Sequence, residues 1–179
     1  MISIIIGILS FIPLVDMYFT KLIYNLPLKD FSTFFSKFII YFNLFINVIL
    51  LYYISFQIIF CRYIVEILIV NLLFKQIIDR KRPRDGFFID NIYNGLSSLT
   101  LFKDYNLFFK KTDSFPSGHV TSVFCTYLLI SRLNNIVFNF CYLIILILTF
   151  YSRINIGAHY FSDCVWAILI SYYSYNLLI

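Results

Sequence analysis

The sequence predicts an all-α integral membrane protein, a bundle of about six transmembrane helices that form a single domain over residues 1–179. Composition is the first observation: 61% of the residues are hydrophobic and 13% are charged, whereas soluble domains carry roughly 25% charged residues. The second observation is a series of apolar runs, each suited to a helix of about 20 residues or fewer. These runs are Met1–Phe19, Phe38–Phe60, Tyr63–Ile78, His119–Ser131, Ile136–Tyr151 and Tyr160–Ile179.

The connections between the runs differ in character. Lys21–Lys37 alternates basic and aromatic residues, which predicts an amphipathic segment lying in the membrane interface. Arg62 and the stretch Arg132–Asn135 are expected to mark tight turns, and Asp79–Ser117 forms a long polar loop. The apolar run at the N-terminus lacks a basic start and a small-residue cleavage site, so we expect it to be a retained helix.

The charge pattern excludes some classes of partner. The formal net charge is +5, yet the chain shows no basic amphipathic stripe or recognition module of the kind that binds nucleic acid. A basic surface near anionic lipid headgroups fits better. The four cysteines are scattered through apolar runs without metal-ligand spacing, so we expect them to be small buried side chains.

Three polar clusters interrupt the apolar background. The first runs from Lys75 to Pro83 at the end of the predicted third helix, and the second, Pro116–His119, opens the fourth. The third begins with Ser152 at the end of the fifth helix and finishes with Asp163 in the sixth. Helices three and five cross the membrane in the same direction, and helices four and six return. All three clusters are therefore expected at one membrane face.

The cations and the glycine of these clusters suit a phosphoryl group, which requires mainly positioning and charge stabilisation from a protein. Lys75, Arg82 and Arg153 supply cationic donors, and the two arginines can each bind two oxygens at once. Ser117 and Gly118 can turn backbone N–H groups and a hydroxyl toward an anion at the start of a helix.

The two histidines complete a set of groups for phosphoryl transfer. His159 and Asp163 are spaced i,i+4 and share a helix face. Asp163 can accept the proton of one ring nitrogen, which leaves the other nitrogen free to attack phosphorus. His119 would protonate the leaving oxygen as a general acid. Pro83 would end the third helix and present Arg82.

Each cluster alone has a structural alternative. An Arg-Pro pair at a helix end is usually a helix stop with a snorkelling cation. The PSGH stretch can be a turn with a helix cap, and an i,i+4 His/Asp pair can be a solvated surface pair. Together, these alternatives would require both histidines and cations from two further segments to meet at one face by accident. Their convergence therefore favours a catalytic site.

The spacing of these residues resembles that of the type 2 phosphatidic acid phosphatase family. The family pattern is Lys, six residues and Arg-Pro; then PSGH; then Ser-Arg, five residues, His, three residues and Asp. In this chain the pattern reads Lys75 to Arg82-Pro83, Pro116 to His119, and Ser152-Arg153 to His159 and Asp163. The similarity covers residues 75–163, and the first two predicted helices match the family in character only.

The resemblance implies a role for each matching residue. His159 would be the nucleophile that forms a phosphohistidine, with Asp163 as its orienting partner and His119 as the acid for the leaving group. The implied phosphate ligands are Lys75, Arg82, Ser117, Gly118 and Arg153. Pro83 and Ser152 would support these ligands. Family members of this type need no metal or other cofactor, and the sequence shows no acidic cluster that would bind a metal.

The predicted function is that of a membrane lipid phosphatase, which hydrolyses a phosphomonoester or pyrophosphate on a lipid through a phosphohistidine. Undecaprenyl pyrophosphate is the favoured substrate, with phosphatidylglycerol phosphate, phosphatidic acid and lipid A phosphate as alternatives. A lipid phosphotransferase with the same site and, less readily, a non-catalytic scaffold stay open. The expected partner is a lipid phosphate within the membrane, and the sequence leaves the oligomeric state open.

Two indicators disagree about the side of the membrane that the site faces. The predicted active face carries twelve of the 14 Lys and Arg residues, leaving Arg62 and Arg132 opposite, and such an excess predicts a cytoplasmic face. The resemblance implies the periplasmic, outer face of a bacterial inner membrane, and we adopt this expectation.

Other polar residues have weaker implications. Glu66 lies inside the third predicted helix, and an acid within a membrane is a functional candidate by default, or else a buried partner of a nearby polar side chain. Arg80, Lys81 and Arg84 flank the first motif and could attract an anionic headgroup, or be ordinary interfacial cations. The aromatic residues of the 84–115 loop could shape lipid entry.

Overall fold

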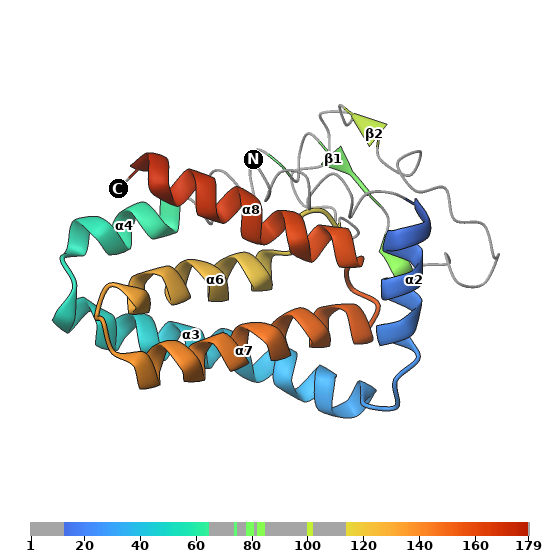
Figure 1. The fold of residues 1–179 in the computed structure, drawn as a ribbon, viewed down its shortest axis with the longest axis horizontal. Helices are drawn as coiled ribbons and strands as arrows, with labels where there is room; N and C mark the ends of the chain where they lie inside the picture. Colours follow the sequence, from blue (N-terminus) through green and yellow to red (C-terminus); the bar gives the residue numbers. More distant parts are fainter. Residues whose placement is uncertain are drawn as a thin grey trace.

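The computed structural model describes residues 13–64, 74, 78–80, 82–84, 100–101 and 114–178. Six helices and one pair of short strands make up this part of the chain (Figure 1). The helices are α2 (Pro13–Tyr24), α3 (Lys29–Tyr53), α4 (Phe56–Ile64), α6 (Gly118–Ser131), α7 (Ile136–Asn155) and α8 (Phe161–Leu178). The strands β1 (Ile78–Asp79) and β2 (Thr100–Leu101) pair antiparallel, so Ile78, predicted as the last residue of the third helix, is extended and the rest of the pair lies in the predicted polar loop. The predicted all-α class is confirmed, with this small strand pair as an addition.

α3, α6, α7 and α8 lie alongside one another and form the body of the molecule, while α2 stands across one end of them (Figure 1). α7 packs on both α3 and α6, and α6 also packs on α8. α2 contacts α7 and α8 at the end of the bundle where α7 finishes and α8 begins. This end is also where the predicted polar clusters are expected to meet.

The predicted bounds of the last three helices agree closely with the structure. α6 and α8 begin within one residue of prediction, and α7 continues four residues beyond Tyr151. The turn at Arg132–Asn135 is confirmed, and Asn134 adopts a positive φ of 52° there. The side chain of Asn135 accepts hydrogen bonds from two backbone N–H groups in the first turn of α7, which caps that helix.

Two of the described helices, α3 and α7, are long and apolar enough to cross a membrane. The core helix of a soluble protein can pass the same test, but only 28% of the most apolar window of each helix is buried. The outward faces carry large exposed apolar side chains, including Tyr41, Leu44, Phe138 and Ile147. An apolar surface of this extent suits contact with lipid rather than water. The structure thus supports a membrane protein, while the number of six spans stays a prediction.

The turn that we expected at Arg62 lies elsewhere. α3 ends at Tyr53, where Ile54 becomes extended, and α4 starts at Phe56. Arg62 lies inside α4, is only 2% exposed, and donates hydrogen bonds to the carbonyl and hydroxyl oxygens of Ser122 in α6. The prediction was wrong because a cation in an apolar run can be buried when oxygens on a neighbouring helix accept its hydrogen bonds.

The interfacial segment predicted at Lys21–Lys37 is also wrong. Its first residues finish α2, and its last residues form the first turns of α3. Lys29 opens α3 and holds its ammonium group 3.9 Å from the centre of the Tyr24 ring. Ser32 and Ser36 are buried, so this part of α3 packs inside the bundle instead of lying flat on a membrane surface.

The first and third predicted helices are described only in part. α2 has 12 residues, which make about 18 Å of helix at 1.5 Å per residue, and the hydrocarbon core of a bilayer is about 30 Å thick. These described residues of α2 are therefore too few to cross a bilayer by themselves. Residues 1–12 of the predicted run Met1–Phe19, and most of Tyr63–Ile78, lie outside the described residues.

The interior of the bundle contains hydrogen bonds that run between helices. Asn43 of α3 donates to the Ser122 hydroxyl at 2.8 Å and accepts from the Tyr142 hydroxyl of α7. Asn47 of α3 donates to the Thr126 hydroxyl of α6 at 3.1 Å. Lipid tails are as apolar as the side chains, so such bonds help to select which helix faces meet. We call this set the mid-bundle network: Asn43, Asn47, Arg62, Ser122, Thr126 and Tyr142.

Candidate active site

The described parts of the three predicted clusters lie together at the end of the bundle where α7 finishes and α8 begins. The Ser117 N–H donates to the Asp163 carbonyl, and the Arg84 N–H, next to Pro83, donates to the Gly157 carbonyl. His119 lies in the first turn of α6, Arg153 in the last turn of α7, and Asp163 in the first turn of α8. The segment Arg82–Arg84 packs against the connection between α7 and α8. The convergence that connectivity predicted is thus present in the structure.

Some of the predicted residues lie outside the described part of the chain. These are Lys75, Lys81, Glu66 and most of the 84–115 loop, including its aromatic residues. The roles expected for them stay predictions.

A glycine allows the Arg82–Arg84 segment to approach the α7–α8 connection closely. Gly157 adopts a positive φ of 68°, and its carbonyl accepts a hydrogen bond from the Arg84 N–H at 3.0 Å. A Cβ atom at Gly157 would lie 2.8 Å from Cε2 of Tyr24 and 3.0 Å from Cβ of Arg84. A larger residue would therefore strain the backbone and displace either this segment or α2.

Positive charge concentrates at this end of the bundle. Arg153 is buried, and Arg82 and Arg84 repel its guanidinium electrostatically. Within the described part of the chain, Arg153 Nε has no hydrogen-bond partner, and neither has the buried hydroxyl of Ser117. Buried donors without partners and clustered like charges are both costly. A bound anion would relieve both costs.

The start of α6 adds backbone donors to this region. Ser117 is the N-cap residue, but its side chain does not cap the helix. Its own N–H donates to the carbonyl of Asp163 at 3.2 Å, which ties the start of α6 to the start of α8. The first N–H groups of a helix have no partner within the helix and carry partial positive charge. Because Gly118 lacks a side chain, an anion can approach these groups closely.

His159 lies in the connection before α8 and is buried, with 3% of its surface exposed. Its Nδ1 is 2.5 Å from the carbonyl oxygen of Ser114. A carbonyl only accepts hydrogen bonds, so Nδ1 carries the proton, and the lone pair of the neutral ring is on Nε2. The hydrogen bond that we expected with Asp163 is not formed, because Nδ1 and Asp163 Oδ2 are 4.0 Å apart.

The carboxylate of Asp163 is buried and engaged elsewhere. Oδ2 accepts a hydrogen bond from the Tyr160 N–H at 2.8 Å, and Oδ1 accepts one from Arg80 at 2.5 Å. The bond to Tyr160 closes the first turn of α8 in the manner of one half of a capping box. Asp163 therefore anchors the start of α8, a contact that the sequence analysis did not foresee.

Arg80 corrects another expectation. It is not an exposed cation that could attract a headgroup, because only 1% of it is exposed. One terminal nitrogen donates to Asp163 and, at 2.7 Å, to the Ser162 hydroxyl; the other forms an ion pair with Asp16 at 2.6 Å. The guanidinium also stacks over the Tyr160 ring, 3.8 Å from its centre. Two carboxylates and an aromatic face compensate for the burial of this charge.

α2 caps the start of α8 from outside that helix. Asp16 Oδ1 accepts from the Ser162 N–H at 2.9 Å, and the Thr20 hydroxyl accepts from the Phe161 N–H at 3.0 Å. Two of the first backbone donors of α8 thus have partners on α2. The sequence analysis missed both residues. An acid inside the first apolar run was the signal that could have identified Asp16.

The end of α7 is held by side-chain hydrogen bonds. The Ser36 hydroxyl of α3 donates to the Ser152 hydroxyl at 3.2 Å, which agrees with a supporting position for Ser152. Asn155 donates to the carbonyls of Ile23 at 2.8 Å and Leu26 at 3.0 Å, where α2 ends. Asn155, which we did not single out from the sequence, therefore joins α7 to α2 beside Arg153.

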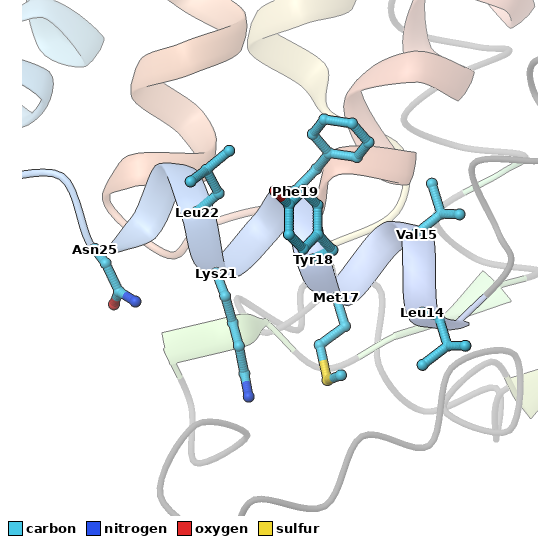
Figure 2. A pocket seen from close by; sticks show the side chains of 8 residues that line it. All are labelled: Leu14, Val15, Met17, Tyr18, Phe19, Lys21, Leu22 and Asn25. Atoms are coloured by element: carbon cyan, nitrogen blue, oxygen red, sulfur yellow. The ribbon is translucent and has the colours of Figure 1, made fainter.

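α2 also borders an open apolar cavity with a volume of about 660 Å³. Figure 2 shows the side chains of the described residues that line it, and these come from α2 and the residue after it. They are Leu14, Val15, Met17, Tyr18, Phe19, Lys21, Leu22 and Asn25. Most of these side chains are apolar, and Lys21 and Asn25 are the polar ones among them. One side of α2 therefore borders an apolar cavity, while Asp16 and Thr20 make polar contacts with the start of α8.

Within the described residues, no group of three or more His, Cys, Asp or Glu side chains is placed to hold a metal ion. Cys125 and Cys164 are buried as expected, whereas Cys141 is exposed on α7. Cys141 therefore belongs to the apolar outer surface and not to the core.

The fold and the site together define a helical membrane protein with a cationic, histidine-containing site at one end of its bundle. The model of the PAP2 superfamily matches residues 47–179, and the chain belongs to this superfamily. The crystal structure of Aquifex aeolicus LpxE is similar in fold, with a TM-score of 0.65 and 21% sequence identity over 90% of this chain and 93% of that one. No curated protein matches the chain. Membership and fold support a phosphatase that acts on a membrane lipid.

Proposed function

We propose that the protein hydrolyses a phosphomonoester or pyrophosphate on a membrane lipid through a phosphohistidine at His159. The observation that carries this proposal is the contact of His159 Nδ1 with the Ser114 carbonyl, which leaves the Nε2 lone pair for attack on phosphorus. The buried donors of Arg153 and Ser117 support it, because they lack partners in the described part of the chain. Membership of the PAP2 superfamily supports the reaction class.

The proposed reaction has two steps. In the first, His159 Nε2 attacks the terminal phosphorus and a P–N bond forms. The P–O bond to the leaving group, the lipid alcohol of a phosphomonoester or the lipid phosphate of a pyrophosphate, breaks while His119 protonates the leaving oxygen. In the second, His119 takes a proton from water as the water attacks the phosphohistidine, and inorganic phosphate leaves with His159 restored. Charge on the equatorial oxygens requires fixed donors. The assigned donors are Lys75, Arg82, Ser117, Gly118 and Arg153, with Pro83 and Ser152 supporting them.

The proposed substrate is undecaprenyl pyrophosphate, and the proposed location is the outer leaflet of a bacterial inner membrane. Both choices rest on the resemblance that the motif residues show. The lipid-facing surface of α3 and α7 and the apolar cavity beside α2 support a substrate whose tail stays in the membrane. Arg62 was counted on the face opposite the active site, and its burial removes it from that count. The distribution of Lys and Arg therefore favours a cytoplasmic position of the active face still more strongly, against the outer leaflet proposed from the resemblance.

The experiment that tests the function is phosphate release by the purified protein in detergent. The substrates are undecaprenyl pyrophosphate, phosphatidylglycerol phosphate, phosphatidic acid and lipid A phosphate, each assayed with and without EDTA, and His159→Ala is the control. We expect release from one lipid, and loss of release in the variant. Absence of release from all four lipids would contradict the proposal. Loss of release in EDTA alone would show a metal requirement that the proposed mechanism lacks.

A further inference from the structure

We infer that Arg80 and Asp16 are positioning residues for the nucleophile, so that α2, which lies outside the three motifs, sets the rate of attack by His159. This inference rests on the proposed function. It also changes the role expected for Asp163. Asp163 orients His159 indirectly, through its ion pair with Arg80 and its hydrogen bond to the Tyr160 N–H, and not by a hydrogen bond to the ring.

The Arg80 backbone fixes the group that holds the histidine ring. The backbone carbonyl of Arg80 accepts a hydrogen bond from the Ser114 N–H at 2.8 Å. The carbonyl of Ser114 is in turn the partner of His159 Nδ1 at 2.5 Å. The Arg80 backbone is therefore linked to His159 Nδ1 through a single residue, Ser114.

The Arg80 side chain fixes the start of α8, directly after His159. Its two terminal nitrogens reach Asp163 and Asp16 at 2.5 Å and 2.6 Å. A guanidinium can bridge two carboxylates in this way because its donors point in fixed, separate directions. Since Asp163 also accepts from the Tyr160 N–H, the ion pair and the backbone turn beside His159 share one carboxylate.

α2 completes this arrangement. Asp16 accepts hydrogen bonds from both the N–H and the hydroxyl of Ser162 besides its ion pair with Arg80. Asp16 is buried with none of its surface exposed, so it is placed to organise the interior and not to meet a substrate. Without Asp16, Arg80 keeps Asp163 as its carboxylate partner among the described residues, and the start of α8 loses a backbone partner.

A positioning role predicts a specific kinetic effect. An error of about 1 Å in the placement of a reacting group can cost on the order of 10²-fold in rate. We expect Asp16→Ala to lower the rate constant for phosphohistidine formation roughly 10- to 100-fold and to leave KM nearly unchanged, because the assigned phosphate ligands stay in place. Asp16→Asn keeps an oxygen acceptor for Ser162 and Arg80, so its rate constant should lie between those of the wild type and Asp16→Ala.

The test is a single-turnover experiment with enzyme in excess over the lipid that the wild-type protein hydrolyses, stopped at short times. When folded enzyme is saturating and in excess, the rate constant of such a turnover does not depend on the fraction of misfolded protein. That fraction is measured separately, from the amount of enzyme needed to convert a fixed amount of lipid in one turnover. A purely structural role of Asp16 would therefore lower the folded fraction and leave the rate constant unchanged. The matched control is Asp30→Ala, which removes an exposed carboxylate from the first turn of α3 and should match the wild type.

The ion pair itself is tested by Arg80→Lys, which keeps the charge but cannot bridge two carboxylates. We expect a loss of rate similar to that of Asp16→Ala, and a double variant that is no slower than the slower single one, since both changes break one unit. A wild-type rate constant in Asp16→Ala would overturn the inference and leave the proposed function intact. Failure of both Asp16 variants to fold would also overturn it, because Asp16 would then serve folding. Absence of turnover by the wild-type protein would overturn the proposed function and, with it, this inference.

Discussion

Arg80 and Arg62 are about equally buried, at 1% and 2% exposure, but their described contacts differ. Arg80 forms ion pairs with carboxylates on α2 and α8, and so joins segments that are far apart in the sequence. Arg62, in the mid-bundle network, donates to hydroxyl and carbonyl oxygens on α6. Ion pairs thus join distant segments at the end where the candidate site lies, while the described hydrogen bonds of the mid-bundle network join the helices in the middle of the bundle. Changes at the two places should therefore differ in what they damage.

The largest effect is expected at His159. His159→Ala should lower phosphate release by at least about 10⁴-fold, because the attacking nitrogen is gone. The thermal unfolding temperature in detergent should stay close to that of the wild type. Rates are measured by phosphate release from the best substrate. Turnover above a few per cent of the wild-type rate would remove His159 from the mechanism.

Arg153 should give the next largest effect. Arg153→Ala removes a buried donor that has no other described partner, and loss of one donor to a developing negative charge costs roughly 10²- to 10³-fold in kcat. Arg132→Ala is the matched control, since Arg132 is exposed at the opposite end of α6 and its loss should leave kcat unchanged. Equal effects of the two substitutions would indicate a general loss of cations, not a site.

Gly157 should give a smaller and mixed effect. Gly157→Ala places a side chain at a positive φ and against Tyr24 and Arg84, a strain that costs about 1 kcal/mol or more. We expect a lower unfolding temperature and a several-fold lower kcat/KM, since the Arg82–Arg84 segment must shift. Unaltered kinetics and stability would show that this close approach has no importance for the site.

The smallest effect on catalysis is expected in the mid-bundle network. Asn43→Ala removes hydrogen bonds to Ser122 and Tyr142, and such bonds between membrane helices contribute about 1 kcal/mol or less. The free energy of unfolding should fall by about 2 kcal/mol or less for the two bonds together. The single-turnover rate constant should stay unchanged. A fall in that rate constant as large as for Asp16→Ala would remove the distinction between the two regions.

Much of the site could be predicted because spacing and connectivity carry it. The ends of α6, α7 and α8 follow from hydropathy, and those ends bring His119, Arg153 and Asp163 together without any knowledge of packing. The turn at Ile54 could not be predicted, because no glycine or proline interrupts the apolar run there. Arg62 was predicted to mark a turn because it is charged. In the structure it lies within α4, and the carbonyl and hydroxyl oxygens of Ser122 on α6 accept its hydrogen bonds.

The part that escaped prediction depends on contacts between distant residues. Hydropathy shows that Asp16 is costly within an apolar run, but not which cation neutralises it. Arg80, Arg82 and Arg84 lie within five positions of one another, and the motif marks only Arg82. Packing alone shows that Arg80 turns inward to Asp16 and Asp163. The same contacts explain why Asp163 is not within hydrogen-bonding distance of His159.

The most direct test of the central claim is to trap the phosphoenzyme. Wild-type protein is mixed with a lipid substrate labelled in the phosphate to be transferred, stopped within one turnover in base, and digested for mass spectrometry. We predict a phosphate on the peptide that contains His159, labile to acid, stable to base, and absent from His159→Ala. Phosphate on another residue, or full turnover with no phosphorylated peptide, would contradict the mechanism.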